Sequence, residues 1–272
     1  MTASSDKTVQ AAIGYSERTE RTPFFYANAH EKDFVPLKPA EVTIRDARGL
    51  ACDLDREGFT LVDHVSAVSD LTDLAAVADV HRAECAALLQ QVTGCDEVQM
   101  TPFGILRFSE KSGANQEHDN SHPARFVHVD MAREDAAAAR ERGAPEGRRI
   151  VRSAQYNLWR SLAGGTQDVP LGLCSYPSVA EGDLLPCRAI FDPLDGSPEW
   201  SFDNYLLAAN PAHKWFYYSD MTRDEAIVFK TSESDPARAQ LMPHGAFDNP
   251  LAGDDAPPRV SLEMRGTAYW FA

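Results

Sequence analysis

The order of the periodic segments constrains this chain most strongly, because one helical stretch comes early and short β-like stretches follow it. Over residues 71–92 apolar residues recur at helical spacing, and Gly94 supplies a stop signal. Residues 132–142 are rich in alanine and charge, which favours a surface helix. Segments rich in β-branched and aromatic residues occupy 57–68, 98–108, 125–131, 149–159, 187–191, 214–219, 226–231 and 259–271. This order predicts a mainly β fold with supporting α-helices, either a sandwich or a barrel with helical support on one side.

Length and composition favour one globular unit. A chain of 272 residues with 43% hydrophobic residues can fill a sizeable core, and β-barrels of this length commonly form one domain. Residues 1–20 show little apolar periodicity, so we expect a flexible N-terminal arm there and a single domain over residues 21–272. No glycine-rich dinucleotide motif or P-loop is present, so nothing favours a nucleotide-binding fold.

The charge and the cysteines limit the partners and the compartment. The formal net charge is −15, which repels nucleic acid and anionic membranes, so we expect neither as a partner. The five cysteines form no CxxC pair and suggest reduced thiols. No apolar run is long enough to span a membrane. We therefore expect a cytoplasmic protein that acts on a small molecule, and the sequence is compatible with a homo-oligomer.

A possible metal site begins at His128 and Asp130, the one pair in the chain with a histidine two residues before an acid. On a strand, a spacing of two places both side chains on the same face. Two imidazoles and one carboxylate suit Fe(II) and leave positions open for other ligands. The third ligand would come from a distant strand, and His244 is the preferred candidate. His213, which also precedes a β-like segment, is the rival.

The last β-like segment carries two arginines on one face. Strand alternation groups Arg259, Ser261, Glu263 and Arg265, while Val260, Leu262 and Met264 take the other face. Two arginines on the inner face of a barrel are costly to bury without anions, and a dicarboxylate such as 2-oxoglutarate would satisfy them. The alternative is a structural ion pair with Glu263, which could also neutralise one arginine while the other binds the co-substrate.

Several motifs together resemble one family of enzymes. The chain contains FVHVDMA (126–132), NLWR (157–160), KWFYYSDMTRDEAIVFKTSESD (214–235), HGAF (244–247) and PPRVSLEMR (257–265). These are similar to the CmcJ/AsaB/gibberellin-desaturase-like hydroxylases and desaturases, a family of Fe(II)/2-oxoglutarate-dependent oxygenases. The likeness covers about residues 57–271.

This resemblance implies a double-stranded β-helix core of the jelly-roll, cupin-like kind. It implies that Fe(II) is bound by His128, Asp130 and His244, and that Arg259, with Arg265, binds 2-oxoglutarate. With O2 as oxidant, such an enzyme would hydroxylate, desaturate or cyclise a small molecule of secondary metabolism. The alternatives are a cupin-like metal enzyme that does not use 2-oxoglutarate and a non-catalytic β-barrel binding protein.

The sequence also offers candidates for the substrate pocket. Asn157, Trp159 and Arg160 follow one another on a β-like segment and are candidate substrate-binding residues, with core packing as the alternative. Tyr217 and Tyr218 are adjacent, so one of them points inward on a strand, but the sequence does not say which. The polar stretches 109–123 and 161–187 are candidates for a lid.

Overall fold

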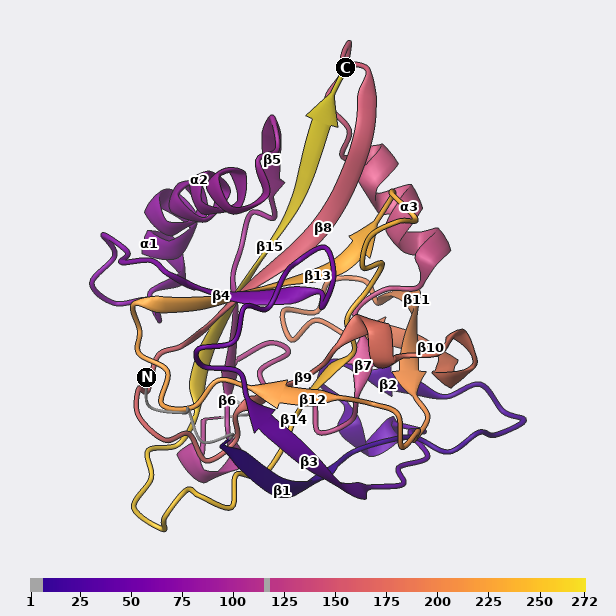
Figure 1. Ribbon diagram of the computed structural model, residues 1–272, viewed down its shortest axis with the longest axis vertical. Helices are drawn as coiled ribbons and strands as arrows, with labels where there is room; N and C mark the ends of the chain where they lie inside the picture. The colour runs from indigo at the N-terminus through magenta and orange to yellow at the C-terminus, as the bar shows by residue number, and fades with distance from the viewer. Residues whose placement is uncertain (1–6, 115–117) are drawn as a thin grey trace.

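The computed structural model describes residues 7–114 and 118–272, which form two packed β-sheets with a helical layer (Figure 1). The nine-stranded sheet has the order β1-β3-β12-β9-β14-β7-β11-β10-β2. Its strands are β1 (Thr8–Ile13), β2 (Phe24–Tyr26), β3 (Ala40–Asp46), β7 (His128–Val129), β9 (Leu171–Cys174), β10 (Leu184–Phe191), β11 (Trp200–Leu207), β12 (Trp215–Tyr217) and β14 (His244–Ala246).

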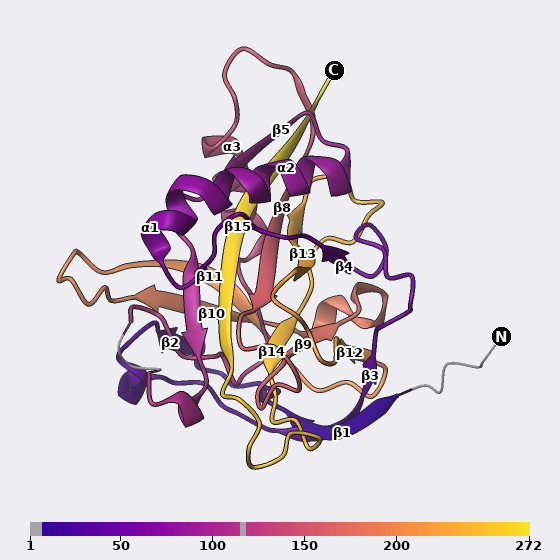
Figure 2. The same cartoon turned by 90° about the vertical axis from the view of Figure 1, so that its left-hand side faces the viewer.

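The second sheet has the order β4-β13-β8-β15-β5, with β6 also paired to β15. Its strands are β4 (Phe59–Asp63), β5 (Glu97–Met100), β6 (Ile105–Phe108), β8 (Ile150–Ser161), β13 (Glu225–Glu233) and β15 (Val260–Phe271). The long pair of β8 and β15 runs through the middle of this sheet in both views (Figures 1 and 2). The expected mainly β architecture with a jelly-roll, double-stranded β-helix core is confirmed.

The helical layer covers the outer face of the six-stranded sheet (Figure 2). The early helical segment forms α1 (Leu74–Ala76), a π-helical turn (Val77–His81) and α2 (Arg82–Thr93). Gly94 ends α2 in the left-handed conformation, as its stop signal predicts. Leu88 and Leu89 of α2 share a core with Leu158 of β8 and Met264 of β15. The outer face of β8 and β15 is therefore largely apolar beneath α2, and Asn157 of β8 and Arg265 of β15 face the other sheet.

Helix α3 (Arg133–Arg142) lies on the opposite side, where it contacts β8 and β13. The alanine-rich segment thus forms the predicted helix. None of the helices in the described ranges is long and apolar enough to cross a lipid bilayer.

Some expected elements differ from the structure. Residues 1–6 of the expected N-terminal arm lie outside the described residues, but residues 8–13 are not a free arm: they form β1, which pairs with β3 along its whole length. Four strands, β1, β2, β3 and β11, have no counterpart in the sequence analysis. The stretch 161–187, expected to be loop with short strands, contains β9 and the start of β10 as expected. Residues 115–117 of the other proposed lid lie outside the described residues.

Candidate metal centre

The three predicted metal ligands meet on the inner face of the nine-stranded sheet. Strands β7 and β14 are neighbours, and His128 lies directly opposite His244 in their register. Asp130 is two residues beyond His128, so it points to the same side. The Nε2 atoms of His128 and His244 lie 3.6 Å and 3.9 Å from Oδ1 of Asp130. One ligand atom from each residue falls within 4.8 Å of the others, which is a separation that a single metal ion can bridge.

Both imidazoles are oriented for metal binding. Their Nδ1 atoms lie 3.3 Å and 3.2 Å from the carbonyl oxygens of Phe126 and Met242, so an Nδ1–H donates to each carbonyl. That tautomer leaves a lone pair on Nε2, the atom that faces Asp130. Burial and the neighbouring His128 lower the pKa of His244 to about 4, so its imidazole is neutral near pH 7.

The Asp130 carboxylate is held by two residues of the other sheet. Nδ2 of Asn157, on β8, donates to Oδ2 at 2.7 Å, and Arg265, on β15, lies 3.2 Å from Oδ1. Burial alone would raise the pKa of Asp130, but the Arg265 guanidinium and the two imidazoles keep it well below its usual range. The carboxylate is thus ionised and fixed in direction. Two neutral imidazoles and one ionised carboxylate fit Fe(II) of the facial-triad type.

Arg259, immediately before β15, is a buried cation with no carboxylate partner among the described residues. Its guanidinium donates to the Ser261 hydroxyl at 3.0 Å and to the Val169 carbonyl at 3.1 Å, and it lies over the ring of Trp159. Burial and the nearby Arg107 lower the pKa of Arg259 to about 9. A buried guanidinium with only neutral hydrogen-bond acceptors favours an anionic ligand.

Arg265 differs from Arg259 because carboxylates already neutralise it. It lies 2.7 Å from Glu263 and 3.2 Å from Asp130. Burial lowers the pKa of Arg265, but the two carboxylates outweigh that effect and raise it. Glu263 therefore partners one arginine and leaves the other free, which is one of the arrangements considered from the sequence. Arg265 therefore orients a metal ligand, and its positive charge is already balanced by carboxylates of the protein, so it is not suited to binding an anionic cofactor.

A narrow pocket joins the triad to Arg259. Its lining comes from both sheets: Arg107, Ala124, His128, Asp130, Trp159, Leu171, His244, Gly245, Ala246, Arg259, Glu263 and Arg265. Its volume of about 20 Å³ holds roughly one water molecule, so a dicarboxylate enters only when lining side chains move. Arg107 was missed in the sequence analysis. No local spacing indicates it, because Arg107 reaches the site through the long-range β6–β15 pairing, in which it lies opposite Ser261 and shares the inner face with it.

Two residues predicted from the sequence lie elsewhere. Arg160 was expected to bind substrate, but it is on the other face of β8 from Asn157 and Trp159, where it donates to the His64 and Arg223 carbonyls. The alternation of β8 excludes it from the pocket. His213 is not the third ligand, because it pairs with Asp183 at 3.1 Å and contacts Tyr15.

The neighbouring tyrosines pack in two different apolar clusters. Tyr217 lies with Val127 and Phe247, whereas Tyr218 lies with Phe59 and Trp159. Neither tyrosine lines the pocket beside the triad.

Comparisons with known proteins place the chain among oxidoreductases that use iron and 2-oxoglutarate. A family model described as an oxidoreductase/YMDC permease-like domain matches residues 13–269. The hydroxylase/desaturase CTB9 of Cercospora beticola is 31% identical over 240 residues, covering 80% of this chain and 72% of the relative. The Fe(II)/2-oxoglutarate-dependent dioxygenase nvfI of Aspergillus novofumigatus is 31% identical over 241 residues, covering 84% of this chain and 82% of the relative.

The fold has a solved counterpart. A structure of the iron and alpha-ketoglutarate-dependent endoperoxidase NvfI aligns over 99% of this chain and 100% of its own, with a TM-score of 0.82 and 24% identity. At that identity the likeness establishes the shared fold.

Proposed function

Because the chain belongs to the Fe(II)/2-oxoglutarate-dependent oxygenases that include these hydroxylase/desaturase relatives, we propose that His128, Asp130 and His244 hold its iron and that Arg259 binds its co-substrate. The protein is an oxidoreductase that uses Fe(II), 2-oxoglutarate and O2 on a small-molecule substrate. One observation carries the assignment of residues. The His-Asp-His cluster shares a pocket with a buried arginine that no carboxylate of the described residues neutralises.

The chain's own residues have separable tasks in this proposal. Nε2 of each imidazole would donate its lone pair to the metal, and Asn157 and Arg265 fix the direction of the Asp130 carboxylate. The guanidinium of Arg259 would pair with a carboxylate of 2-oxoglutarate. Trp159, 1% exposed, limits the access of water. Iron with 2-oxoglutarate and O2 supplies the oxidation of an unactivated C–H bond.

The substrate class follows from the relatives. Names such as hydroxylase/desaturase support the proposal that the enzyme hydroxylates, desaturates or cyclises a small molecule of secondary metabolism. Its charge of −15 supports the absence of a nucleic-acid or anionic-membrane partner, and its five free cysteines support action in the cytoplasm. The homo-oligomer stays a prediction that light scattering would test.

Succinate release tests the proposal directly. With Fe(II), 2-oxoglutarate and O2, the wild-type protein should release succinate above the background of an iron-free sample, and Asp130→Ala should not. If the wild type binds iron but neither binds 2-oxoglutarate nor releases succinate, the result favours the cupin-like alternative that does not use 2-oxoglutarate. If it binds no iron at all, it is a non-catalytic β-barrel.

A further inference from the structure

A second, larger cavity lies between α3 and the end of β13. Its volume is about 250 Å³, and its lining is mostly polar: Met131, Arg133, Ala136, Arg140, Thr231, Ser232, Glu233, Ser234, Gln240 and Leu241. It adjoins the metal centre along the chain, because Met131 follows Asp130 and Leu241 lies three residues before His244. The pocket at the triad has a volume of only about 20 Å³, so most of an organic substrate would need a larger cavity, such as the one beside α3.

Paired residues on one face of β8 and β15 contact both the metal centre and Arg140, which lines the larger cavity. Asn157 lies opposite Arg265 in the β8–β15 register, and both contact Asp130. Four residues further along β8, Ser153 lies opposite Tyr269. Since a strand rises about 3.3 Å per residue, the Ser153–Tyr269 pair is about 13 Å from the Asn157–Arg265 pair.

Ser153 and Tyr269 both contact Arg140 of α3. The Arg140 Nε donates to the Ser153 hydroxyl at 3.1 Å, and the Tyr269 hydroxyl donates to the Arg140 carbonyl at 2.8 Å. Between the Asn157–Arg265 and Ser153–Tyr269 pairs, Gln155 lies opposite Thr267, and both residues are only partly buried.

Arg140 is a buried cation without an anionic partner among the residues that the structure describes. It is 8% exposed, and the partners of its guanidinium are the hydroxyls of Ser153 and Ser232. No carboxylate in the described parts of the chain forms an ion pair with it, and burial lowers its pKa. Two of its five N–H donors are used, so three remain for a ligand.

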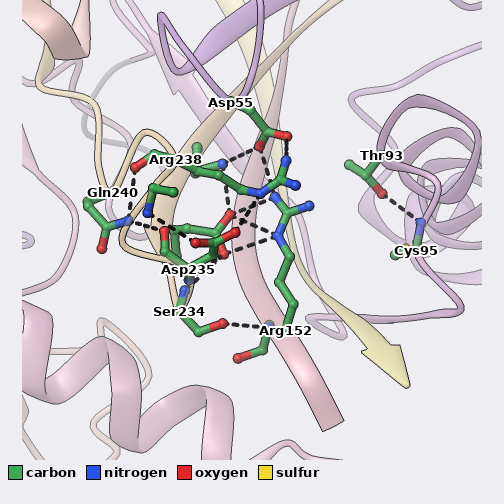
Figure 3. Close-up of polar contacts among 12 residues, drawn as sticks. Asp55, Thr93, Cys95, Arg152, Ser234, Asp235, Arg238 and Gln240 are labelled. Atoms are coloured by element: carbon green, nitrogen blue, oxygen red, sulfur yellow. Dashed lines mark hydrogen bonds and ion pairs between the residues drawn. The ribbon is translucent and has the colours of Figure 1, made fainter. Parts of the chain in front are cut away.

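The nearest carboxylate in the lining, Glu233, is already neutralised. It lies 2.8 Å from Lys230 and 2.7 Å from Arg152. Figure 3 shows the rest of this network, in which Asp55 faces the guanidiniums of Arg152 and Arg238. The other arginine of the lining, Arg133, pairs with Glu181. Arg140 is thus the one lining cation among the described residues whose charge no carboxylate balances.

We propose that this cavity is the substrate pocket and that Arg140 pairs with a carboxylate on the small-molecule substrate, roughly 13 Å from the residues that hold Asp130. A single positive charge with Glu233 nearby suits a monoanion better than a phosphate dianion. The substrate is then a carboxylic acid whose oxidised carbon lies at the far end of the molecule. This inference rests on the proposed function, because the metal centre defines where that carbon must be.

Paired probes test the inference. The protein, loaded with Fe(II) and saturating 2-oxoglutarate under nitrogen, is titrated calorimetrically with octanoate and 4-phenylbutyrate and with their primary carboxamides. Each carboxylate should bind about tenfold or more tightly than its amide, because a charge-assisted pair replaces a neutral one. Arg140→Gln should remove that preference. Arg142→Gln, the same change at an exposed position of the same helix, should keep it.

A second pair of variants avoids the buried arginine. Ser234 lines the cavity but is exposed, so Ser234→Glu adds a negative charge at the rim without burying it. This variant should weaken binding of the carboxylates and leave the amides unchanged, whereas Ser234→Gln should affect neither. Equal affinity for acids and amides, a preference that survives in Arg140→Gln, or no binding of either acid would each overturn the inference. Failure of the proposed function is separate, because it would appear earlier as a protein that does not take up Fe(II) and 2-oxoglutarate.

Discussion

At the scale of residues, Arg259 and Arg265 have different roles because, among the described residues, only the Arg265 guanidinium forms ion pairs with carboxylates. Arg259 is buried, Arg265 is partly buried, and both face the pocket. The Arg265 guanidinium lies against Glu263 and Asp130, whereas that of Arg259 contacts a hydroxyl, a carbonyl and an aromatic ring. A carboxylate ligand could form an ion pair with Arg259 without displacing another one. At Arg265 it would have to compete with the existing ion pairs to Glu263 and Asp130.

This difference predicts that substitutions of the two arginines affect different ligands. Arg259→Gln should raise the dissociation constant of 2-oxoglutarate about tenfold to a hundredfold, since a hydrogen bond to a charged group contributes about 1.5–3 kcal/mol. Its affinity for iron should change little. Arg265→Gln should instead lower iron affinity by freeing Asp130 and leaving Glu263 unpaired. Anaerobic calorimetry with each ligand separates the two outcomes, and identical profiles would contradict the division of roles.

Asn157 provides a test of how the metal carboxylate is oriented. Asn157→Leu keeps the branching at Cγ but removes the 2.7 Å hydrogen bond to Asp130, so iron affinity should fall about tenfold to a hundredfold. Gln155→Leu is the matched control, because Gln155 lies two residues away on the same strand. Iron titration under nitrogen measures both. Equal effects of the two variants would mean that the hydrogen bond does not orient the ligand.

At the scale of elements, the metal site depends on strands too short to hold themselves in place. Strand β7 has two residues and β14 has three, so the chains beside them fix their position. The backbone after β1 does this for β7. The carbonyl of Gly14 accepts a hydrogen bond from the amide of Val127, next to His128. A Cβ on Gly14 would lie 2.0 Å from the carbonyl oxygen of Arg125, and a backbone atom cannot easily move aside.

Gly14→Ala should therefore lower the free energy of unfolding by about 1–3 kcal/mol, as overpacking usually does. Urea denaturation compared with Gly182→Ala measures the effect, since a Cβ at Gly182 would have no atom within 4 Å. A Gly14→Ala protein as stable as the control would show that β1 does not constrain β7.

The attachment of α2 to the preceding loop predicts a pH dependence. Burial alone would raise the pKa of Glu84, but hydrogen bonds from Ser66, the Ala67 amide and His81 lower it to about 2. A lowered folded-state pKa contributes stability that is present above pH 4.5 and is lost as pH falls towards 2.

Glu84→Gln should consequently be less stable than the wild type above pH 4.5, and the difference should shrink as pH falls towards 2. Glu134→Gln, an exposed change at the start of α3, is the control. Thermal unfolding across this pH range measures the effect. A wild-type advantage that does not change with pH would contradict the role of the Glu84 carboxylate.

At the scale of the whole molecule, the sequence predicts what depends on local spacing and misses what depends on long-range pairing. The His-x-Asp spacing and the alternation around Arg259 place side chains on one face, so the metal site could be proposed without a structure. Strand β3 pairs with both β1 and β12, and Trp215 lies opposite Ile44 across more than half of the chain. No local pattern specifies such pairings. Alternation shows from the sequence that the adjacent Trp159 and Arg160 point to opposite faces of β8, but it does not say which of the two faces is the inner one.

The charge distribution of the molecule also has a functional consequence. The chain carries a net charge of −15, but the pocket at the triad is lined by three arginines and by two acids, Asp130 and Glu263. An anionic co-substrate therefore meets a locally basic site within an acidic protein, and a bound metal would increase this contrast.

Anaerobic titration with Fe(II) and then 2-oxoglutarate tests the central claim most directly, through the weak visible charge-transfer absorption of the chelate. The account predicts that this absorption appears in the wild type, is absent in His128→Ala, and requires a much higher 2-oxoglutarate concentration in Arg259→Ala. If the wild type binds iron but 2-oxoglutarate produces no absorption, or if Arg259→Ala titrates like the wild type, the assignment of this pocket is wrong.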